Sequence, residues 1–227
     1  MEKELYDINN YVDRIFYINM DKDVERNENM IKQFRKHGIW NYERMPGIVI
    51  ESIPENHRIL GPFNNNTDIE TYVKGSIGAL FSHKKIIEIA MERKYSRICI
   101  FEDDITLIDN FKENFYTYIE SLNSQNPAYQ IAYLGLTNEY KEVKENLKIK
   151  EVKNHAYGAY AYIINDLNWV FQYILQNIDF VFQEIDLLYN SLLSQNLLSY
   201  CYVCVPNIAR HDWNFGSNIG NNKTNLI

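Results

Sequence analysis

The stretch that decides the fold is Arg97-Ile98-Cys99-Ile100-Phe101-Glu102-Asp103-Asp104, an apolar run that leads straight into three carboxylates. An apolar run without polar interruption is typical of a strand that is buried on both faces of a parallel sheet. The turn-like Lys94-Tyr95-Ser96 marks where this strand begins. In open α/β sheets, ligands bind beyond the carboxyl ends of the strands, which is where the three carboxylates would lie.

The three adjacent carboxylates repel one another, so they indicate either a bound cation or a solvated acidic turn. If the strand continues, its period of two places Glu102 and Asp104 on one side and Asp103 on the other. Two oxygen donors on one side suit Mg²⁺ or Mn²⁺, which bridge a substrate diphosphate to a protein. The eight residues alone leave both interpretations open.

The composition is that of an ordinary globular protein. The 227 residues are 46% hydrophobic and 23% charged, which argues against disorder and allows one α/β domain or two small ones. The formal charge of −7 argues against nucleic acid or an anionic membrane as the main partner. Any bound phosphate then needs a metal ion or a local cluster of donors. The 18 tyrosines leave aromatic surface for stacking on sugars or bases, although most are expected in the core.

The cysteines indicate a reducing compartment, because Cys99, Cys201 and Cys204 provide no disulfide framework. Cys201 and Cys204 have the spacing of half a zinc site, but they lie in a predicted strand, where residues three apart face opposite ways. Buried thiols are therefore expected. The N-terminal residues lack the basic and apolar regions of a signal peptide, and no apolar run approaches transmembrane length. The sequence thus predicts a cytoplasmic protein without a transmembrane segment.

Strands and helices alternate along the chain. The apolar patterns predict strands over residues 14–18, 42–45, 97–101, 129–134, 156–164 and 198–205, and helices over 24–37, 76–93, 110–122, 166–176 and 184–195. Residues 51–75 are expected to form a long loop with a lid-like role, and residues 140–153 a charged surface excursion. The alternation predicts an α/β fold with a mostly parallel central sheet flanked by helices. We expect one domain over residues 1–220 and a polar tail over 221–227.

Six segments carry a resemblance to a known family. In chain order they are Ile18-Asn19-Met20 with Arg26, Arg44-Met45-Pro46-Gly47, Gly78 with Ser82-His83, Glu102-Asp103-Asp104, Gly158-Ala159-Tyr160-Ala161-Tyr162 and Glu184-Ile185-Asp186. Their order and spacing resemble glycosyltransferase family 25, the lipopolysaccharide-type and collagen-type galactosyl- and glucosyltransferases with a GT-A fold. The resemblance covers roughly residues 14–220.

Two departures from the family pattern fall near the expected site. The chain has Arg210-His211 and then Ser217-Asn218-Ile219 where the family usually has a Gln ahead of a terminal Ser-Asp-Ile. Ala159-Tyr160 stands where the family often has Thr-His. The identity of the sugar is therefore not carried over from the resemblance.

The resemblance implies a GT-A-like (Rossmann-like) domain that moves galactose or glucose from a UDP-hexose to a glycan or protein hydroxyl, with inversion. Mn²⁺ or Mg²⁺ would stabilise the departing diphosphate. Asp104 is the first candidate ligand, Glu102 a second ligand or a ribose contact, and His211 a further ligand, although a lone histidine is often structural. Asp186 is the preferred general base and Glu184 the alternative; both could equally be helix N-terminal charges.

The remaining candidates are donor contacts. Asn19 and Arg26 follow the first strand, where nucleotide contacts are expected, although they could serve as a turn former and a surface charge. Ser82 and His83 lie on the helix before the acidic strand, where packing and donor contact are equally consistent with the pattern. Asp103 and Glu102 complete the expected donor-binding set.

Two other functions stay open. A nucleotidyltransferase would share the α/β architecture and the metal carboxylates, but the turn Asn19-Met20-Asp21-Lys22-Asp23 lacks the glycine of the expected Gly-rich loop. A catalytically silent module that binds carbohydrate or nucleotide is made plausible by the two departures. The sequence indicates neither the acceptor, the donor sugar nor the oligomeric state.

Overall fold

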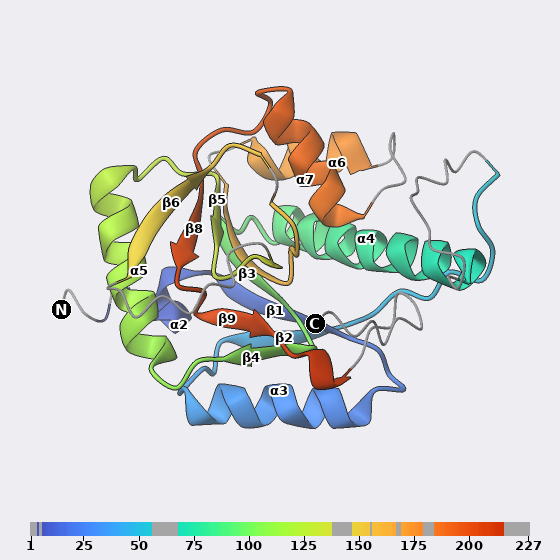
Figure 1. Cartoon of the computed structure of the whole chain (residues 1–227), viewed down its shortest axis with the longest axis horizontal. Coiled ribbons are helices and arrows are strands. Elements are labelled where there is room, and N and C mark those ends of the chain that lie inside the picture. The colour runs from blue at the N-terminus through green and yellow to red at the C-terminus, as the bar shows by residue number, and fades with distance from the viewer. Residues whose placement is uncertain are drawn as a thin grey trace, which may run out of the picture.

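The computed structural model describes residues 4, 6–55, 68–137, 147–154, 156–166, 169–178 and 184–215, and a sheet runs through its centre. The strands of this sheet, in chain order, are β1 (Arg14–Asn19), β2 (Tyr42–Pro46), β3 (Arg97–Glu102), β5 (Ile131–Tyr133), β6 (Lys148–Val152), β7 (Ala161–Asn165) and β8 (Cys201–Val205). Within the described residues they form a seven-stranded sheet in the order β2-β1-β3-β7-β5-β8-β6 (Figure 1). A second, two-stranded sheet joins β4 (Ile105–Leu107) to β9 (Ala209–His211).

Most strands of the central sheet run in one direction. The pairs β1·β2, β1·β3 and β5·β8 are parallel. Strand β7 is inserted antiparallel between β3 and β5, and β6 runs antiparallel along the edge of β8. Strands β2, β1, β3, β5 and β8 therefore share one direction. The predicted α/β fold with a mostly parallel sheet is confirmed.

Helices cover both faces of the sheet (Figure 1). Their bounds are α2 (Ile8–Tyr11), α3 (Val24–Lys36), α4 (Ile69–Glu92), α5 (Phe111–Gln125), α6 (Val170–Ile178) and α7 (Ile185–Ser194), with a 3₁₀ turn η2 (Trp213–Phe215). Buried side chains of α4, α6 and α7 form a core with one face, and those of α2, α3 and α5 a core with the other. No helix in these described ranges is long and apolar enough to cross a membrane.

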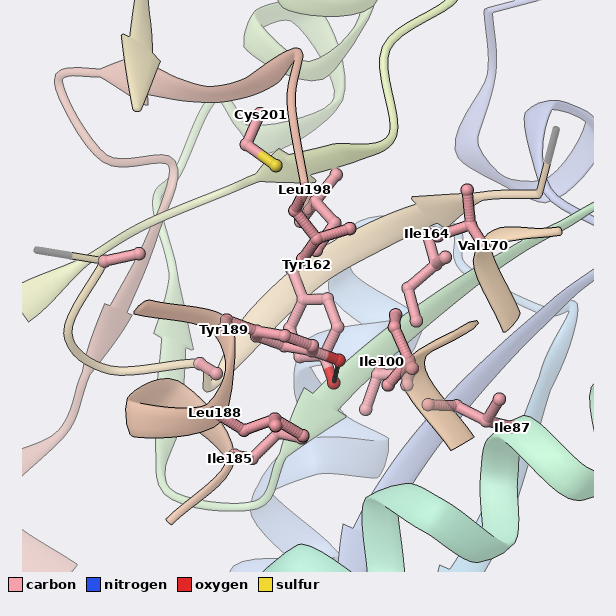
Figure 2. Packing of buried hydrophobic residues seen from close by; sticks show 14 of the residues in the cluster. Ile87, Ile100, Tyr162, Ile164, Val170, Ile185, Leu188, Tyr189, Leu198 and Cys201 are labelled. Atoms are coloured by element: carbon pink, nitrogen blue, oxygen red, sulfur yellow. Dashed lines mark hydrogen bonds between the residues drawn. The ribbon is translucent and has the colours of Figure 1, made fainter. Parts of the chain in front are cut away.

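Strand β3 contributes side chains to both cores, which explains its unbroken apolar sequence. Ile98 and Ile100 face the core of α4, α6 and α7, where Ile100 lies near Tyr162 of β7 (Figure 2). Cys99 and Phe101 face the opposite core. Alternate side chains of a strand point to opposite faces, so a strand between two helical layers needs apolar residues throughout.

The three cysteines are buried free thiols, as the sequence predicts. Cys201 lies in the core of α4, α6 and α7, whereas Cys204 and Cys99 lie in the core on the other face. The spacing Cys201–Cys204 therefore reflects strand geometry, and the two sulfur atoms do not share a site.

Two predicted boundaries are wrong by five residues or more. Helix α4 begins at Ile69, seven residues before the predicted start at residue 76, so the expected loop over 51–75 is shorter; its residues 56–67 lie outside the described part. Asp68 caps the helix by accepting a hydrogen bond from the Thr71 N–H at 3.3 Å. The first turns of α4 carry polar side chains towards a cleft, so they lack the apolar period that marks a helix. The predicted strand over 156–164 is confined to β7, with residues 156–160 leading into it.

Three strands escaped prediction. Residues 148–152 form the edge strand β6 within what was expected to be a surface excursion; residues 140–146 of that segment are not among those described. Its mostly exposed side chains obscure the strand pattern. Strands β4 and β9 are three residues each, too short to show a period, and they pair antiparallel. The predicted polar tail, residues 221–227, lies outside the described residues.

Candidate active site

The carboxyl ends of β1, β2 and β3 meet at one edge of the sheet, as their parallel pairing requires. Asn19 at the end of β1 is in register with Pro46 of β2, and Ile18 is in register with Glu102 of β3. The residues that follow each strand are thereby brought together although they are far apart in sequence. This edge collects most of the predicted site residues.

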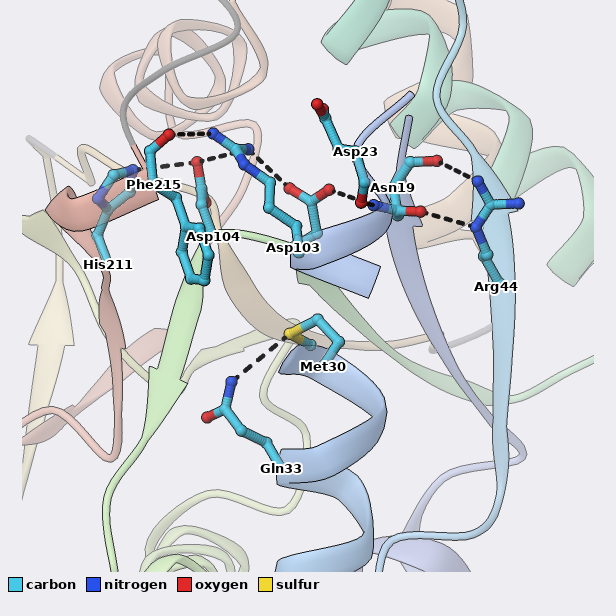
Figure 3. Close-up of polar contacts among 10 residues, drawn as sticks. Asn19, Asp23, Met30, Gln33, Arg44, Asp103, Asp104, His211 and Phe215 are labelled. Carbon is cyan, nitrogen blue, oxygen red and sulfur yellow. Dashed lines mark hydrogen bonds and ion pairs between the residues drawn. The ribbon is translucent and has the colours of Figure 1, made fainter. Parts of the chain in front are cut away.

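Asp103 joins the ends of β1 and β3 to helix α3. Its carboxylate accepts a hydrogen bond from Asn19 Nδ2 at 2.6 Å and one from Arg26 Nη1 at 2.9 Å (Figure 3). Asn19 in turn accepts one from Arg44 Nε at 2.8 Å. Burial raises the pKa of Asp103 above its usual value, and the hydrogen bonds from Asn19 and Arg26 offset part of this rise. The two oxygens of Asp103 thus bind two other predicted site residues, Asn19 and Arg26.

Asp104 points to the opposite side and meets His211 (Figure 3). Its Oδ2 lies 3.3 Å from His211 Nε2 and 3.5 Å from Arg26 Nη1. The pairing of β4 with β9 sets this contact, because it aligns Ile105 with His211. Burial opposes protonation of His211, but the hydrogen bond and the charge of Asp104 raise its pKa overall. His211 therefore lies beside the acidic triplet, and its role as a further metal ligand stays a prediction.

The donor set around Asp104 fits a hard divalent cation in part. Asp104 Oδ1 is buried and has no hydrogen-bond partner among the described residues, which is unusual for a carboxylate oxygen. No group of three His, Cys, Asp or Glu side chains converges as a complete metal site within the part of the chain that the structure describes. Mg²⁺ commonly binds one or two protein carboxylates and takes its other ligands from substrate phosphates and water. Asp104, with Glu102 as a second carboxylate, meets that smaller requirement.

Glu102 is the end of a buried chain of polar groups. Its Oε1 lies 3.2 Å from His83 Nε2, His83 Nδ1 lies 2.7 Å from the Tyr162 hydroxyl, and the Tyr189 hydroxyl lies 3.1 Å from that of Tyr162. Burial lowers the pKa of His83 to about 3, so the ring is neutral and carries one N–H. If the Tyr162 hydroxyl donates to Nδ1, the Nε2–H donates to Glu102. His83 is fully buried, which favours packing and orientation over direct donor contact.

Gly78 and Ser82 hold the segment after β2 against α4. The Ser82 hydroxyl accepts a hydrogen bond from the Ile48 N–H at 2.9 Å and donates one to the Gly78 carbonyl at 2.7 Å. A Cβ atom on Gly78 would collide with the Ile48 carbonyl oxygen. The spacing Gly-x-x-x-Ser thus allows one helix face to approach a second backbone closely. Ser82 is buried, and its described contacts are structural.

Two cavities flank the strand ends. The first, which we call the strand-end cleft, has a volume of about 220 Å³ and lies between the ends of β1 to β3, the segment after β2 and helix α4. The second, which we call the acidic pocket, has a volume of about 310 Å³ and lies between α4, α7, the segment before β7 and η2. Glu102 lines both cavities. Lys22, Arg26 and Lys74 line the strand-end cleft, whereas the described residues that line the acidic pocket include no lysine or arginine.

Glu184 and Asp186 both line the acidic pocket at the start of α7. Glu184 accepts hydrogen bonds from the Tyr72 hydroxyl and, at 3.4 Å, from the Ser76 hydroxyl. Burial, followed by the charge of Asp186, raises the pKa of Glu184 to about 7. Burial also raises the pKa of Asp186, while backbone N–H donors offset part of the rise. The two carboxylates thus have different hydrogen-bond donors, side-chain hydroxyls at Glu184 and backbone N–H groups at Asp186.

Gly158 orients Asp186. Its N–H donates to Asp186 Oδ2 at 3.1 Å, and its φ of +85° belongs to the left-handed region that favours glycine. A Cβ atom at this position would also collide with the Thr137 hydroxyl. Thr137 and the Asp186 carboxylate are therefore the close neighbours that favour glycine here.

Sequence reasoning missed several residues of the site. Arg44 belongs to one of the family motifs but is not among the predicted site residues, yet its side chain donates a hydrogen bond to Asn19 and lies 2.6 Å from Asp21. Tyr157 and Trp213 line the acidic pocket. Trp213 lies two residues after the candidate ligand His211. An aromatic residue at that place in a polar segment is unusual, and this could have indicated its role.

Comparison with known proteins defines the class. Residues 12–189 match the family model for glycosyltransferase family 25 (LPS biosynthesis protein). The chain belongs to glycosyltransferase family 25, which confirms the resemblance. It spans 27% of the "probable inactive glycosyltransferase 25 family member 3" of Bos taurus, with 24% identity over 167 residues and 67% of this chain.

Two further relatives differ in their names. Procollagen galactosyltransferase 2 of Homo sapiens is 21% identical over 176 residues, which are 72% of this chain and 26% of the relative. A putative glycosyltransferase, R655, of Acanthamoeba polyphaga mimivirus is 27% identical over 140 residues, 61% of this chain and 42% of that protein. Among solved structures, a glycosyltransferase involved in glycosylation of the major capsid of PBCV-1 aligns with a TM-score of 0.43 at 11% identity, covering 88% of this chain and 82% of that one.

Proposed function

We propose that the chain is a hexosyltransferase that moves galactose or glucose from a UDP-sugar to a hydroxyl group, with inversion at the anomeric carbon. The observation that carries the proposal is that Glu102 lines both the strand-end cleft and the acidic pocket. A donor in one cavity and an acceptor in the other would meet at this carboxylate. Membership in glycosyltransferase family 25 favours this reaction over nucleotidyl transfer.

The donor belongs in the strand-end cleft because of its charges. Lys22, Arg26 and Lys74 line it and would attract a diphosphate. Asp104, with Glu102, would hold Mn²⁺ or Mg²⁺, and the ion would neutralise charge on the departing diphosphate. Arg26, which already lies within 3.5 Å of Asp104 Oδ2, would add a second positive charge at the same place.

The acceptor belongs in the acidic pocket, where the candidate bases lie. Its hydroxyl oxygen would form a bond to the anomeric carbon while the bond from that carbon to the diphosphate oxygen breaks. The hydroxyl proton would pass to a carboxylate, and the diphosphate would carry the negative charge away. Asp186 is the preferred base because the Gly158 N–H at 3.1 Å and the Leu187 N–H at 2.8 Å fix its orientation. Glu184 is the alternative, since its pKa of about 7 matches a base that works at neutral pH.

A second candidate function is a catalytically silent module that binds the donor without turnover. It is favoured by the names of the bovine, rat, mouse and human family members 3, which describe those proteins as inactive or probably inactive. For either function we propose a cytoplasmic location, because the three cysteines are buried free thiols.

The decisive experiment is a screen of UDP-hexoses with Mn²⁺, in which UDP release and UDP affinity are measured separately. The proposed enzyme releases UDP from at least one donor, and release rises when an acceptor is added. UDP-sugar binding without release would support the silent module. A protein that binds no UDP-sugar with or without Mn²⁺ would contradict both.

A further inference from the structure

The acidic pocket has an aromatic wall. Trp213 and Tyr157 line it and keep 62% and 41% of their surface exposed. The Trp213 ring lies beside that of His211, with ring centroids 4.3 Å apart. A large aromatic side chain that is exposed inside a cavity leaves its face available to a ligand.

The wall is fixed to the rest of the site. Arg26 Nη2 donates to the Phe215 carbonyl at 3.2 Å, and the guanidinium lies over the Phe215 ring at 5.8 Å. The Asp212 N–H donates to the Asp104 carbonyl at 2.6 Å. The turn that carries Trp213 is therefore attached, through Asp212 and Phe215, to two residues of the strand-end cleft. These contacts hold the turn in place at the edge of the acidic pocket.

The charges of the pocket select against anions. Three carboxyl groups, those of Glu102, Glu184 and Asp186, line it, and among the described lining residues the one basic side chain is His211. His211 is already paired with Asp104, whose Oδ2 lies 3.3 Å from His211 Nε2. Once these carboxyl groups are ionised, which for Glu184 requires a pH above about 7, a carboxylate or phosphate on a ligand would be repelled at close range in this partly buried space. Hydroxyl and ammonium groups, in contrast, can donate hydrogen bonds to the carboxylates.

We propose that the acidic pocket is a subsite for one uncharged or amino-bearing pyranose ring of the acceptor, stacked on Trp213, and that it rejects acidic sugars. A pyranose presents C–H groups on its face and hydroxyls at its edge, which match an aromatic wall and a set of carboxylates. The volume of about 310 Å³ is at the lower end of ligand pockets, which span about 300–1,000 Å³, and so suits one ring. The inference rests on the proposed function, of which it specifies the acceptor.

The test is direct binding, without donor or turnover. Methyl glucoside, methyl glucosaminide and methyl glucuronide are titrated against the intact protein and followed by ligand-observed NMR. The first two should bind, and the glucuronide should bind at least tenfold more weakly. Trp213→Ala should weaken binding of the first two about tenfold. Trp40→Ala is the matched control, because Trp40 is equally exposed, at 69%, and lines neither cavity.

Several outcomes would overturn the inference. They are equal affinity for the glucuronide, equal effects of Trp213→Ala and Trp40→Ala, and binding of a hydroxyl-bearing peptide in place of every glycoside. UDP affinity, measured on the same samples, keeps this test separate from the proposed function. Loss of glycoside binding with UDP affinity intact refutes the subsite alone, whereas absence of UDP binding refutes the donor site.

Discussion

The strand-end cleft and the acidic pocket share the Glu102 side chain, but they are built in different ways. One side of the cleft is formed by residues at the ends of parallel strands, so these polar groups lie at one edge of the sheet, and helix α4 forms the other side. The pocket is assembled from the start of α7, the segment before the antiparallel β7 and the turn after β9. The first cavity follows from a general rule of α/β sheets, whereas the second depends on connections particular to this chain.

The largest effect is expected at the strand-end cleft. Asp104→Asn removes the charge of the candidate metal ligand, so transfer should fall about 10³-fold and UDP affinity should lose its dependence on Mn²⁺. Steady-state rates and calorimetry measure the two effects. Asp109→Asn, an exposed aspartate paired with Lys36, is the matched control and should change neither. Turnover of Asp104→Asn at the wild-type rate would remove Asp104 from the site.

Substitutions of the carboxylates in the acidic pocket should lower the transfer rate and leave the affinity for UDP unchanged. Asp186→Asn removes the preferred base, so transfer should fall about 10²–10⁴-fold while UDP affinity stays unchanged. Glu184→Gln should have the smaller effect. Stopped-assay rates and UDP titrations of both variants decide between them. A reversed order makes Glu184 the base, and wild-type rates for both would place the base elsewhere.

The pH dependence of transfer also distinguishes Asp186 from Glu184 as the general base. A base must be deprotonated, and burial raises the pKa of Glu184 from 4.5 to about 7. If Glu184 is the base, the rate should fall as pH drops through 7, and Glu184→Gln should remove that fall. The raised pKa also means that stability contributed by Glu184 is present below pH 4.5 and lost as pH rises through 7. Thermal unfolding of Glu184→Gln should therefore vary less with pH across this window.

The buried chain of polar groups that ends at Glu102 should show an intermediate effect. Tyr162→Phe removes the hydroxyl that bonds His83 Nδ1, so His83 loses the partner that orients it towards Glu102. Transfer should fall about tenfold, and the free energy of unfolding should fall by about 1–3 kcal/mol because a buried acceptor is left unpaired. Tyr189→Phe, which breaks only the far hydrogen bond, is the control. If both variants transfer at equal rates, the chain of polar groups serves packing alone.

The smallest effect concerns the backbone beneath the cleft. Gly78→Ala should weaken UDP binding and lower stability by about 1–3 kcal/mol, because its methyl group meets the Ile48 carbonyl. Gly38→Ala is the control: its φ of +63° also makes alanine unfavourable, but no atom lies within 4 Å of the added methyl. Chemical denaturation and UDP titration should give reduced stability in both and reduced affinity only in Gly78→Ala. Equal UDP affinity in the two variants would dissociate Gly78 from the cleft.

The same contrast explains what the sequence could predict. The apolar run of β3 and the carboxylates behind it indicate a buried strand and a strand-end site, because both depend on local pattern and on parallel pairing. The start of α4 at Ile69 was missed because its first turns face a cleft and not the core. Trp213 was missed because its role depends on the pairing of β4 with β9, whose three-residue strands show no period. Residues 216–220, which include the departure at Asn218, are not among those described.

The opposite orientations of Cys201 and Cys204 have a practical consequence. Burial raises the pKa of both thiols, as it does for Cys99, so none reacts readily with an alkylating reagent while its surroundings stay closed. Cys201 reports on the layer of α4, α6 and α7, and Cys204 and Cys99 on the layer of α2, α3 and α5. Pulsed alkylation followed by peptide mass spectrometry would thus time the opening of each helical layer separately, without any introduced label.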